Sequence, residues 1–80
     1  MKTAKEMFKK LGWDKTSEYN YRVAYIKYDR NDNEYLIMFN KGNRDIEFEF
    51  PRGINQLAFC KKLFQAIQKQ IEELGWCSNE

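Results

Sequence analysis

The chain contains no histidine among its 80 residues. Histidine is the usual general base near neutral pH, and it completes the Ser-His and Cys-His pairs of nucleophilic catalysis. Its absence excludes these catalytic pairs and every zinc site that uses an imidazole ligand.

Cysteine is also scarce. The two cysteines, Cys60 and Cys77, are too few for a four-cysteine zinc site. If residues 55–74 are helical, as argued below, the first lies near the helix start and the second just past its end. Residues 60 to 74 would rise roughly 21 Å along the axis, whereas a disulfide needs Cα atoms about 4.4–6.8 Å apart. Two unpaired thiols are typical of a reducing compartment and predict a cytoplasmic protein.

Long hydrophobic runs are missing. The longest, Tyr35 to Phe39, is far shorter than the ~20 residues that a membrane span needs. The first six residues carry lysines with no apolar stretch behind them, so no signal peptide is expected. The net charge is +2, 42% of residues are hydrophobic and 32% are charged, a composition typical of soluble globular domains. We expect one domain over residues 1–80, with residues 76–80 as a frayed tail.

Two segments have the pattern of amphipathic helices. In the first, Thr3 and Glu6 form a capping box, and apolar residues recur at helical spacing until Gly12 ends the helix. The second runs from Asn55 to Leu74 and ends in the same Leu-Gly-Trp motif. The apolar stripe of the second helix is Leu57, Cys60, Phe64, Ile67, Ile71 and Leu74, and Phe59, Leu63 and Ala66 widen it.

Three segments between the helices are rich in β-branched or aromatic residues or alternate in polarity: Tyr19–Tyr28, Glu34–Asn40 and Asp45–Phe50. Residues 29–33 and 41–44 are typical of turns, and residues 13–18 are predicted to be a polar connector. The order α-β-β-β-α predicts an α+β fold of two layers. In it, both helices pack on one face of a three-stranded antiparallel meander.

Short turns predict the strand register. If Tyr28 faces Glu34 and Asn40 faces Asp45, the apolar residues of the three strands share one face. This face is predicted to be buried under the helices, and it consists of Tyr21, Val23, Tyr25, Tyr35, Ile37, Phe39, Ile46, Phe48 and Phe50.

The same register leaves a second apolar group on the opposite, uncovered face. It consists of Ala24, Ile26, Tyr28, Leu36 and Met38, with Glu47 and Glu49 along one side. A contiguous apolar patch with a polar rim is typical of a contact with a protein partner or a second copy of the chain. An ordinary half-exposed sheet face is the alternative interpretation.

No pattern predicts an active site, a metal site or a cofactor. Residues 29–33 begin like a calcium loop, but glutamate and asparagine stand where that loop needs glycine and glutamate, so a hairpin turn is favoured. Glu47 and Glu49 share a strand face without a pocket or a positioned cation. The four glycines form no phosphate-binding loop. We expect no small-molecule substrate.

Basic residues gather on the helices and suggest a second kind of partner. Lys5 and Lys9, with their neighbours Lys2 and Lys10, belong to the first helix, and Arg52, Lys61 and Lys62 lie near the start of the last. Such a surface could bind the phosphates of a nucleic acid, or could simply be solvated. The α-β-β-β-α order is also that of the double-stranded RNA-binding domain. However, residues 29–33 lack the Gly-Pro-x-His that those domains use.

Two segments near the ends of the chain share a Leu-Gly-Trp ending: Thr3-Ala-Lys-Glu-Met-Phe-Lys-Lys-Leu-Gly-Trp13 and Ala66-Ile-Gln-Lys-Gln-Ile-Glu-Glu-Leu-Gly-Trp76. These segments resemble the ends of small phage and prophage proteins of Gram-positive bacteria. The resemblance implies a cytoplasmic accessory protein of an infected or lysogenic cell, and it brings no catalytic or binding residues. The sequence therefore favours a non-enzymatic protein that binds a partner or itself through the uncovered sheet face. Nucleic-acid binding through the basic helix surfaces is the alternative.

Overall fold

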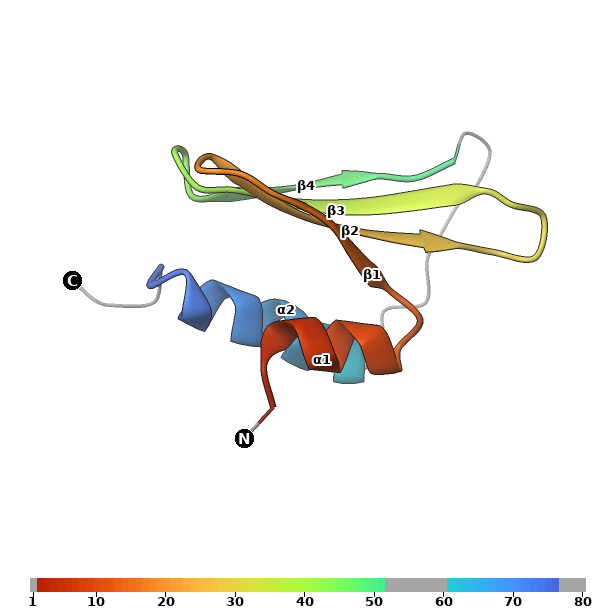
Figure 1. The fold of residues 1–80 in the computed structure, drawn as a ribbon, viewed down its shortest axis with the longest axis horizontal. Helices are drawn as coiled ribbons and strands as arrows, with labels where there is room; N and C mark the ends of the chain where they lie inside the picture. Colours follow the sequence, from red (N-terminus) through yellow and green to blue (C-terminus); the bar gives the residue numbers. More distant parts are fainter. Residues whose placement is uncertain (1, 52–60, 77–80) are drawn as a thin grey trace.

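The structure, a computed structural model, describes residues 2–51 and 61–76. Within these ranges the order is helix, four strands, helix (Figure 1). The elements are α1 (Ala4–Lys10), β1 (Asp14–Glu18), β2 (Arg22–Tyr28), β3 (Glu34–Asn40), β4 (Asp45–Glu49) and α2 (Lys61–Glu73). The strands form one antiparallel sheet in the order β1-β2-β3-β4. The α+β class is confirmed.

The expectation of three strands is wrong, because the segment predicted to be a polar connector contains β1. This strand has no apolar residue, and it pairs with β2 through its backbone, with a register shift between Lys15 and Ser17. Charged residues are common on edge strands, which have only one neighbour. Over the described residues the order is therefore α-β-β-β-β-α, which differs from the α-β-β-β-α order of the double-stranded RNA-binding domain.

The predicted register is confirmed at both remaining strand pairs. Tyr28 lies opposite Glu34, and Asn40 lies opposite Asp45. The predicted first strand is shorter than expected at its start, because Tyr19 closes the β1–β2 turn. Its backbone N–H donates to the Arg22 carbonyl at 2.7 Å.

The core lies between the sheet and the two helices, which occupy the same side of the sheet in Figure 1. Most of the predicted buried face contributes to it: Val23, Tyr25, Tyr35, Ile37 and Phe39 are buried, and Ile46 and Phe50 pack against them. Two members of that face are not buried. Tyr21 is 61% exposed because it stands in the turn before β2, and Phe48 is 45% exposed on the edge strand β4.

Both ends of α1 and the C-terminal end of α2 follow the predicted capping patterns. The capping box of Thr3 and Glu6 is present at the start of α1. At its end Gly12 has a φ of 91°, and the Trp13 N–H donates to the Phe8 carbonyl at 3.0 Å. The α2 end repeats this arrangement, because the Trp76 N–H donates to the Ile71 carbonyl at 3.1 Å. Gly12 and Gly75 lie just beyond the two helices, and both have a positive φ, which favours glycine.

The buried stripe of α2 differs from the predicted one at Phe64, which is exposed, and at Gln70, which is buried. Phe64, expected in the stripe, is 57% exposed. The buried residues are Leu63, Ala66, Ile67 and Gln70, which follow one another at helical spacing. The predicted helix start at Asn55, as well as Leu57, Phe59, Cys60, Cys77 and the tail after Trp76, lies outside the described residues.

The two helices run antiparallel, with the start of α1 beside the end of α2. The Glu73 carboxylate of α2 accepts a hydrogen bond at 2.8 Å from the backbone N–H of Ala4, the first residue of α1. An acceptor there satisfies one of the backbone donors that a helix start leaves without an intrahelical partner. In the described residues, neither helix has the length and apolar character that crossing a membrane would require.

Candidate anion-binding surface

The predicted sheet-face patch is only partly accessible. Ala24 and Met38 are buried, at 4% and 7% exposure. Ile26 and Leu36, which face each other across β2 and β3, are half-buried, and Tyr28 is 56% exposed. The side chains that a partner could contact without rearrangement are therefore Tyr28 and the outer parts of the Ile26–Leu36 pair.

A polar network covers one end of the same sheet face. The Arg22 Nε donates to Asn40 Oδ1 at 3.2 Å, and the Asn40 amide donates at 2.9 Å to both Asp45 and Glu47. The network joins β2, β3 and β4, and it uses both amide hydrogens of Asn40. This end of the face is acidic and internally hydrogen-bonded, which disfavours an anionic ligand there.

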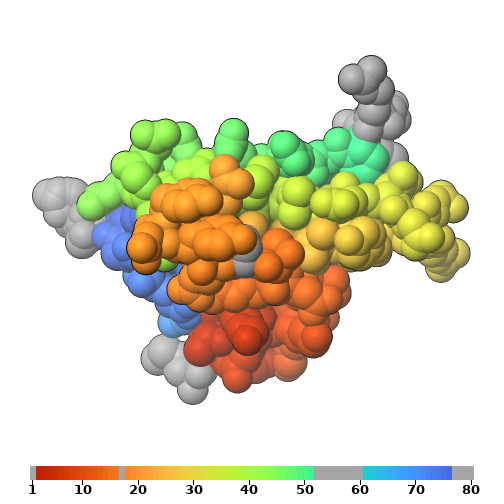
Figure 2. Space-filling model, turned by 45° about the horizontal axis from the view of Figure 1, so that its top comes forward, coloured from red at the N-terminus to blue at the C-terminus, as the bar shows by residue number. Residues whose placement is uncertain are grey.

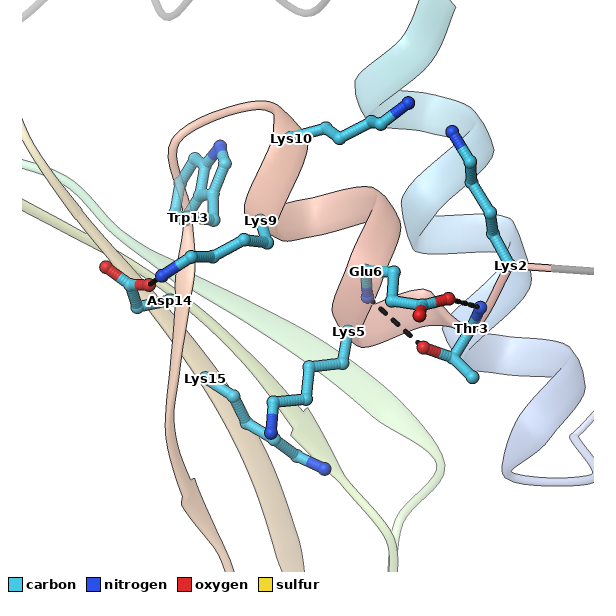
Figure 3. Close-up of a pocket in the computed structure, with 9 residues that line it drawn as sticks. All are labelled: Lys2, Thr3, Lys5, Glu6, Lys9, Lys10, Trp13, Asp14 and Lys15. Carbon is cyan, nitrogen blue, oxygen red and sulfur yellow. Dashed lines mark hydrogen bonds and ion pairs between the residues drawn. The ribbon is translucent and has the colours of Figure 1, made fainter.

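Lysines gather instead beside α1. A cleft of about 690 Å³ lies along α1 and the start of β1. Figure 3 shows its lining, and Figure 2 shows α1, in red, directly below the β1–β2 hairpin, in orange. We call this cleft the lysine cleft. It is lined by Lys2, Thr3, Lys5, Glu6, Lys9, Lys10, Trp13, Asp14 and Lys15.

A second hollow, of about 360 Å³, lies between the two helices, and we call it the interhelical cleft. It shares Lys2 and Lys10 with the lysine cleft and adds Lys62 from the first described turn of α2. Met7, Leu11 and Gln65 complete its lining, so no carboxylate is among the described residues around it.

The carboxylates near the lysine cleft already have partners. Glu6 belongs to the α1 capping box, and Asp14 accepts a hydrogen bond from Lys9 at 2.7 Å. Just outside the cleft, Glu18 pairs with Lys15 at 2.5 Å, and this hydrogen bond lowers the pKa of Glu18. Among the described residues, the other lysines of the cleft (Lys2, Lys5 and Lys10) form no ion pair. The cleft therefore keeps an excess of positive charge.

The structure brings together some of the predicted basic residues and separates others. Lys5 and Lys9 line the lysine cleft, and Lys62 lines the interhelical cleft. Lys61 is exposed on α2 but lines neither cleft, and Arg52 lies outside the described residues. Sequence reasoning missed Lys15, because it assigned this residue to a connector, and no helical or strand pattern in that segment could have placed it beside α1.

An exposed aromatic pair at the β1–β2 turn was also missed. The rings of Tyr19 and Tyr21 stack with centroids 5.4 Å apart and an interplanar angle of 11°. They are 54% and 61% exposed, and the Arg22 guanidinium lies 5.9 Å from the centre of the Tyr21 ring. The prediction that Tyr21 is buried concealed this pair. Each tyrosine contributes polar and apolar surface at the tip of the hairpin.

Residues 29–33 form a turn that the Asp29 carboxylate organises. This carboxylate accepts hydrogen bonds from the backbone N–H of Asn31 at 2.8 Å and of Asn33 at 3.0 Å. It also accepts from the Asn33 side chain and the Tyr35 hydroxyl, both at 3.0 Å. These contacts, with the Asn33 side chain the largest contributor, lower the pKa of Asp29.

We expect this turn to make folding stability sensitive to acid. Because the folded pKa of Asp29 lies below its unfolded value, its contribution is complete above about pH 4 and is lost as the pH falls through the folded pKa. Asp29→Asn should therefore weaken the turn at neutral pH and flatten the acid limb of a plot of unfolding free energy against pH. An unchanged acid limb, measured by urea denaturation from pH 2 to pH 6, would show that Asp29 does not control it.

In the described parts of the chain, no group of three or more cysteine, aspartate or glutamate side chains is arranged to hold a metal ion. In the described lining of both clefts lysines outnumber carboxylates, and such cations attract anions. Comparison of the chain with protein-family models, curated proteins and solved structures finds no match.

Proposed function

We propose that the protein is a non-enzymatic binding protein whose lysine cleft holds the phosphate backbone of a nucleic acid. The observation that carries the proposal is the gathering of five lysines, against two carboxylates, among the described residues that line one cleft. Phosphate contacts from lysines supply most of the affinity in nonspecific nucleic-acid binding, and they need no base-specific side chains.

The small net charge of +2 does not oppose this function, because the charges are segregated. Asp45, Glu47 and Glu49 belong to β4, at the opposite edge of the sheet from β1 and its lysine. A ligand in the lysine cleft is therefore close to five of the fourteen lysine and arginine residues and remote from this acidic strand. As a phage or prophage accessory protein, the role that the sequence resemblance implies, the chain would meet nucleic acid in the host cytoplasm.

Binding should fall with added salt in proportion to the number of phosphates contacted. If Lys2, Lys5 and Lys10 each neutralise one phosphate, a logarithmic plot of duplex affinity against salt should have a slope of about −2.7. Lys5→Gln with Lys10→Gln should reduce this slope to about −0.9. Fluorescence anisotropy of a labelled duplex, at 20 to 200 mM salt, measures both values.

A matched control separates the cleft from net charge. Arg30→Gln with Arg44→Gln removes the same two charges from exposed turn residues that line neither cleft. This control should lose clearly less affinity than Lys5→Gln with Lys10→Gln, since its charges do not line the cleft and salt weakens the interaction between separated surface charges. Equal losses in the two double variants would contradict the cleft as the site. Absence of binding at 20 mM salt would exclude nucleic-acid binding altogether.

A protein contact through the sheet face is the second candidate, and the 56% exposure of Tyr28 beside the Ile26–Leu36 pair supports it. If this face mediates self-association, Tyr28→Lys with Leu36→Lys should produce a monomer in sedimentation equilibrium at concentrations where the parent associates. A parent that stays monomeric at all concentrations, or a double variant that associates equally well, would exclude self-association through this face.

A further inference from the structure

The interhelical cleft differs from the lysine cleft in that lysines from both helices line it. Lys2 comes from the residues before α1, Lys10 from the last turn of α1, and Lys62 from α2. Figure 3 shows the amino groups of Lys2 and Lys10 approaching each other from opposite ends of α1, in front of α2. These three cations are brought together by the antiparallel packing of the helices and not by a run of sequence.

The electrostatics of this cluster are unfavourable without a ligand. Contact with the Lys10 amino group is the largest cause that lowers the pKa of Lys2. Glu6 opposes this lowering with a smaller influence, and the charge of Lys62 makes the smallest contribution, in the same direction as Lys10. No described residue of the cleft lining supplies a compensating negative charge. An anion placed among the three ammonium groups would replace repulsion by attraction.

The lining suits a compact, strongly charged anion. Met7 and Leu11 contribute apolar contacts, and the Gln65 amide offers a neutral hydrogen-bond donor beside the three ammonium groups. A phosphate monoester carries a charge of about −1.5 to −2 at neutral pH and has three acceptor oxygens. A phosphodiester of a nucleic-acid backbone carries a single negative charge. Three convergent lysines therefore favour the monoester.

We propose that Lys2, Lys10 and Lys62 form a subsite for one phosphate monoester at the end of the lysine cleft. The inference rests on the proposed function, and it specifies the part of the ligand that the interhelical cleft recognises. The monoester could be the terminal phosphate of a nucleic-acid strand or a small phosphate compound. In the first case the strand continues along the lysine cleft, with which the subsite shares Lys2 and Lys10.

Two oligonucleotides of identical sequence, one with a 5′-phosphate and one with a 5′-hydroxyl, test this subsite by fluorescence anisotropy with the label at the 3′ end. We expect the 5′-phosphate to strengthen binding by at least fivefold. Lys62→Gln should remove this preference, and Lys61→Gln should keep it, because Lys61 is the exposed neighbour that lines neither cleft. The two variants have the same net charge and differ only in the position of the lost lysine.

Each outcome separates the subsite from the function on which it rests. Equal affinity for the two oligonucleotides would overturn the subsite while leaving nucleic-acid binding intact. If neither oligonucleotide binds, the proposed nucleic-acid function is overturned. The subsite is then overturned as well, unless titration with inorganic phosphate shifts the side-chain NMR signals of Lys2, Lys10 and Lys62. Such shifts in the parent and their loss in Lys62→Gln would support the subsite with a small phosphate compound as its ligand. A preference that persists in Lys62→Gln, or that Lys61→Gln removes equally, would contradict the assignment to these lysines.

Discussion

Phe8→Ala is expected to lower the free energy of unfolding by about 3–5 kcal/mol. Phe8 has no solvent exposure, and its ring stacks on Tyr25 with centroids 4.0 Å apart. The Trp13 and Phe39 rings lie nearly perpendicular to the Phe8 ring, with centroids 6.3 and 6.2 Å from its centroid. Removing this ring leaves a cavity at the point where α1 meets the sheet. Aromatic contacts of this kind add to the loss of buried apolar area.

This loss is comparable with the total stability of a domain of this size, which is about 4–12 kcal/mol at 0.05–0.15 kcal/mol per residue. Phe48→Ala is the matched control, because it removes the same atoms from a side chain that is 45% exposed. We expect the control to cost less than half as much. Guanidinium denaturation followed by circular dichroism at 25 °C measures both. Equal losses would mean that the core is not centred on Phe8.

The local features of the fold could be predicted from the sequence because each depends on neighbouring residues. The cap of α1 needs only Thr3, Glu6 and Gly12 in the right order, and the structure confirms all three roles. The register of β2, β3 and β4 follows from two short turns together with alternating polarity. A one-residue shift would expose Ile37 and Phe39, so this register is strongly determined.

Features that depend on tertiary contacts could not be predicted in the same way. The strand β1 has no apolar residue and so gives no alternation signal, yet its backbone pairs with β2. Met38 was assigned to the outer sheet face and expected to be accessible, but its exposure is only 7%. Such burial depends on neighbours that a face assignment does not measure. Phe64 was assigned to the buried stripe of α2 because it is apolar, whereas the polar Gln70 takes a buried position.

The candidate site was predictable only in part for the same reason. Lys5 and Lys9 stand four residues apart on one helix, so their common surface follows from helical periodicity. The meeting of Lys2, Lys10 and Lys62 requires the antiparallel packing of two helices from opposite ends of the chain. A sequence pattern can show that basic residues are numerous on a helix, but the convergence of three of them requires the fold.

The buried Gln70 provides the second large expected effect. The Tyr25 hydroxyl donates a hydrogen bond to Gln70 Oε1 at 2.5 Å, and the residues are only 1% and 5% exposed. This bond ties α2 to the central part of the sheet. Tyr25→Phe leaves the Gln70 carbonyl without its donor, and Gln70→Met leaves the hydroxyl without its acceptor. Each should cost about 1–3 kcal/mol, because an unpaired buried polar group keeps its desolvation penalty.

The double variant Tyr25→Phe with Gln70→Met distinguishes this pairing from ordinary packing. With both polar partners gone, no unpaired group remains, so the double variant should be more stable than the sum of the single losses indicates, by about 0.5–3 kcal/mol. Urea denaturation of the four proteins of this cycle measures the coupling. Simple additivity of the two losses would contradict an energetic role for the hydrogen bond.

The alkaline limb of a plot of unfolding free energy against pH offers an independent check on the Tyr25 hydroxyl. Burial, with a smaller contribution from the charge of Glu73, raises the pKa of Tyr25 far above that of an exposed tyrosine. Because the folded pKa exceeds the unfolded value, the contribution of Tyr25 to stability is complete below about pH 10 and declines as the pH rises beyond it. Tyr25→Phe should therefore lose less stability than the parent between pH 9 and pH 11. The limb will be reduced and not abolished, since the pKa of Tyr35 is also raised, by burial and by its hydrogen bond to Asp29. An alkaline limb of full size in Tyr25→Phe would show that the Tyr25 hydroxyl is accessible to solvent and not held against Gln70.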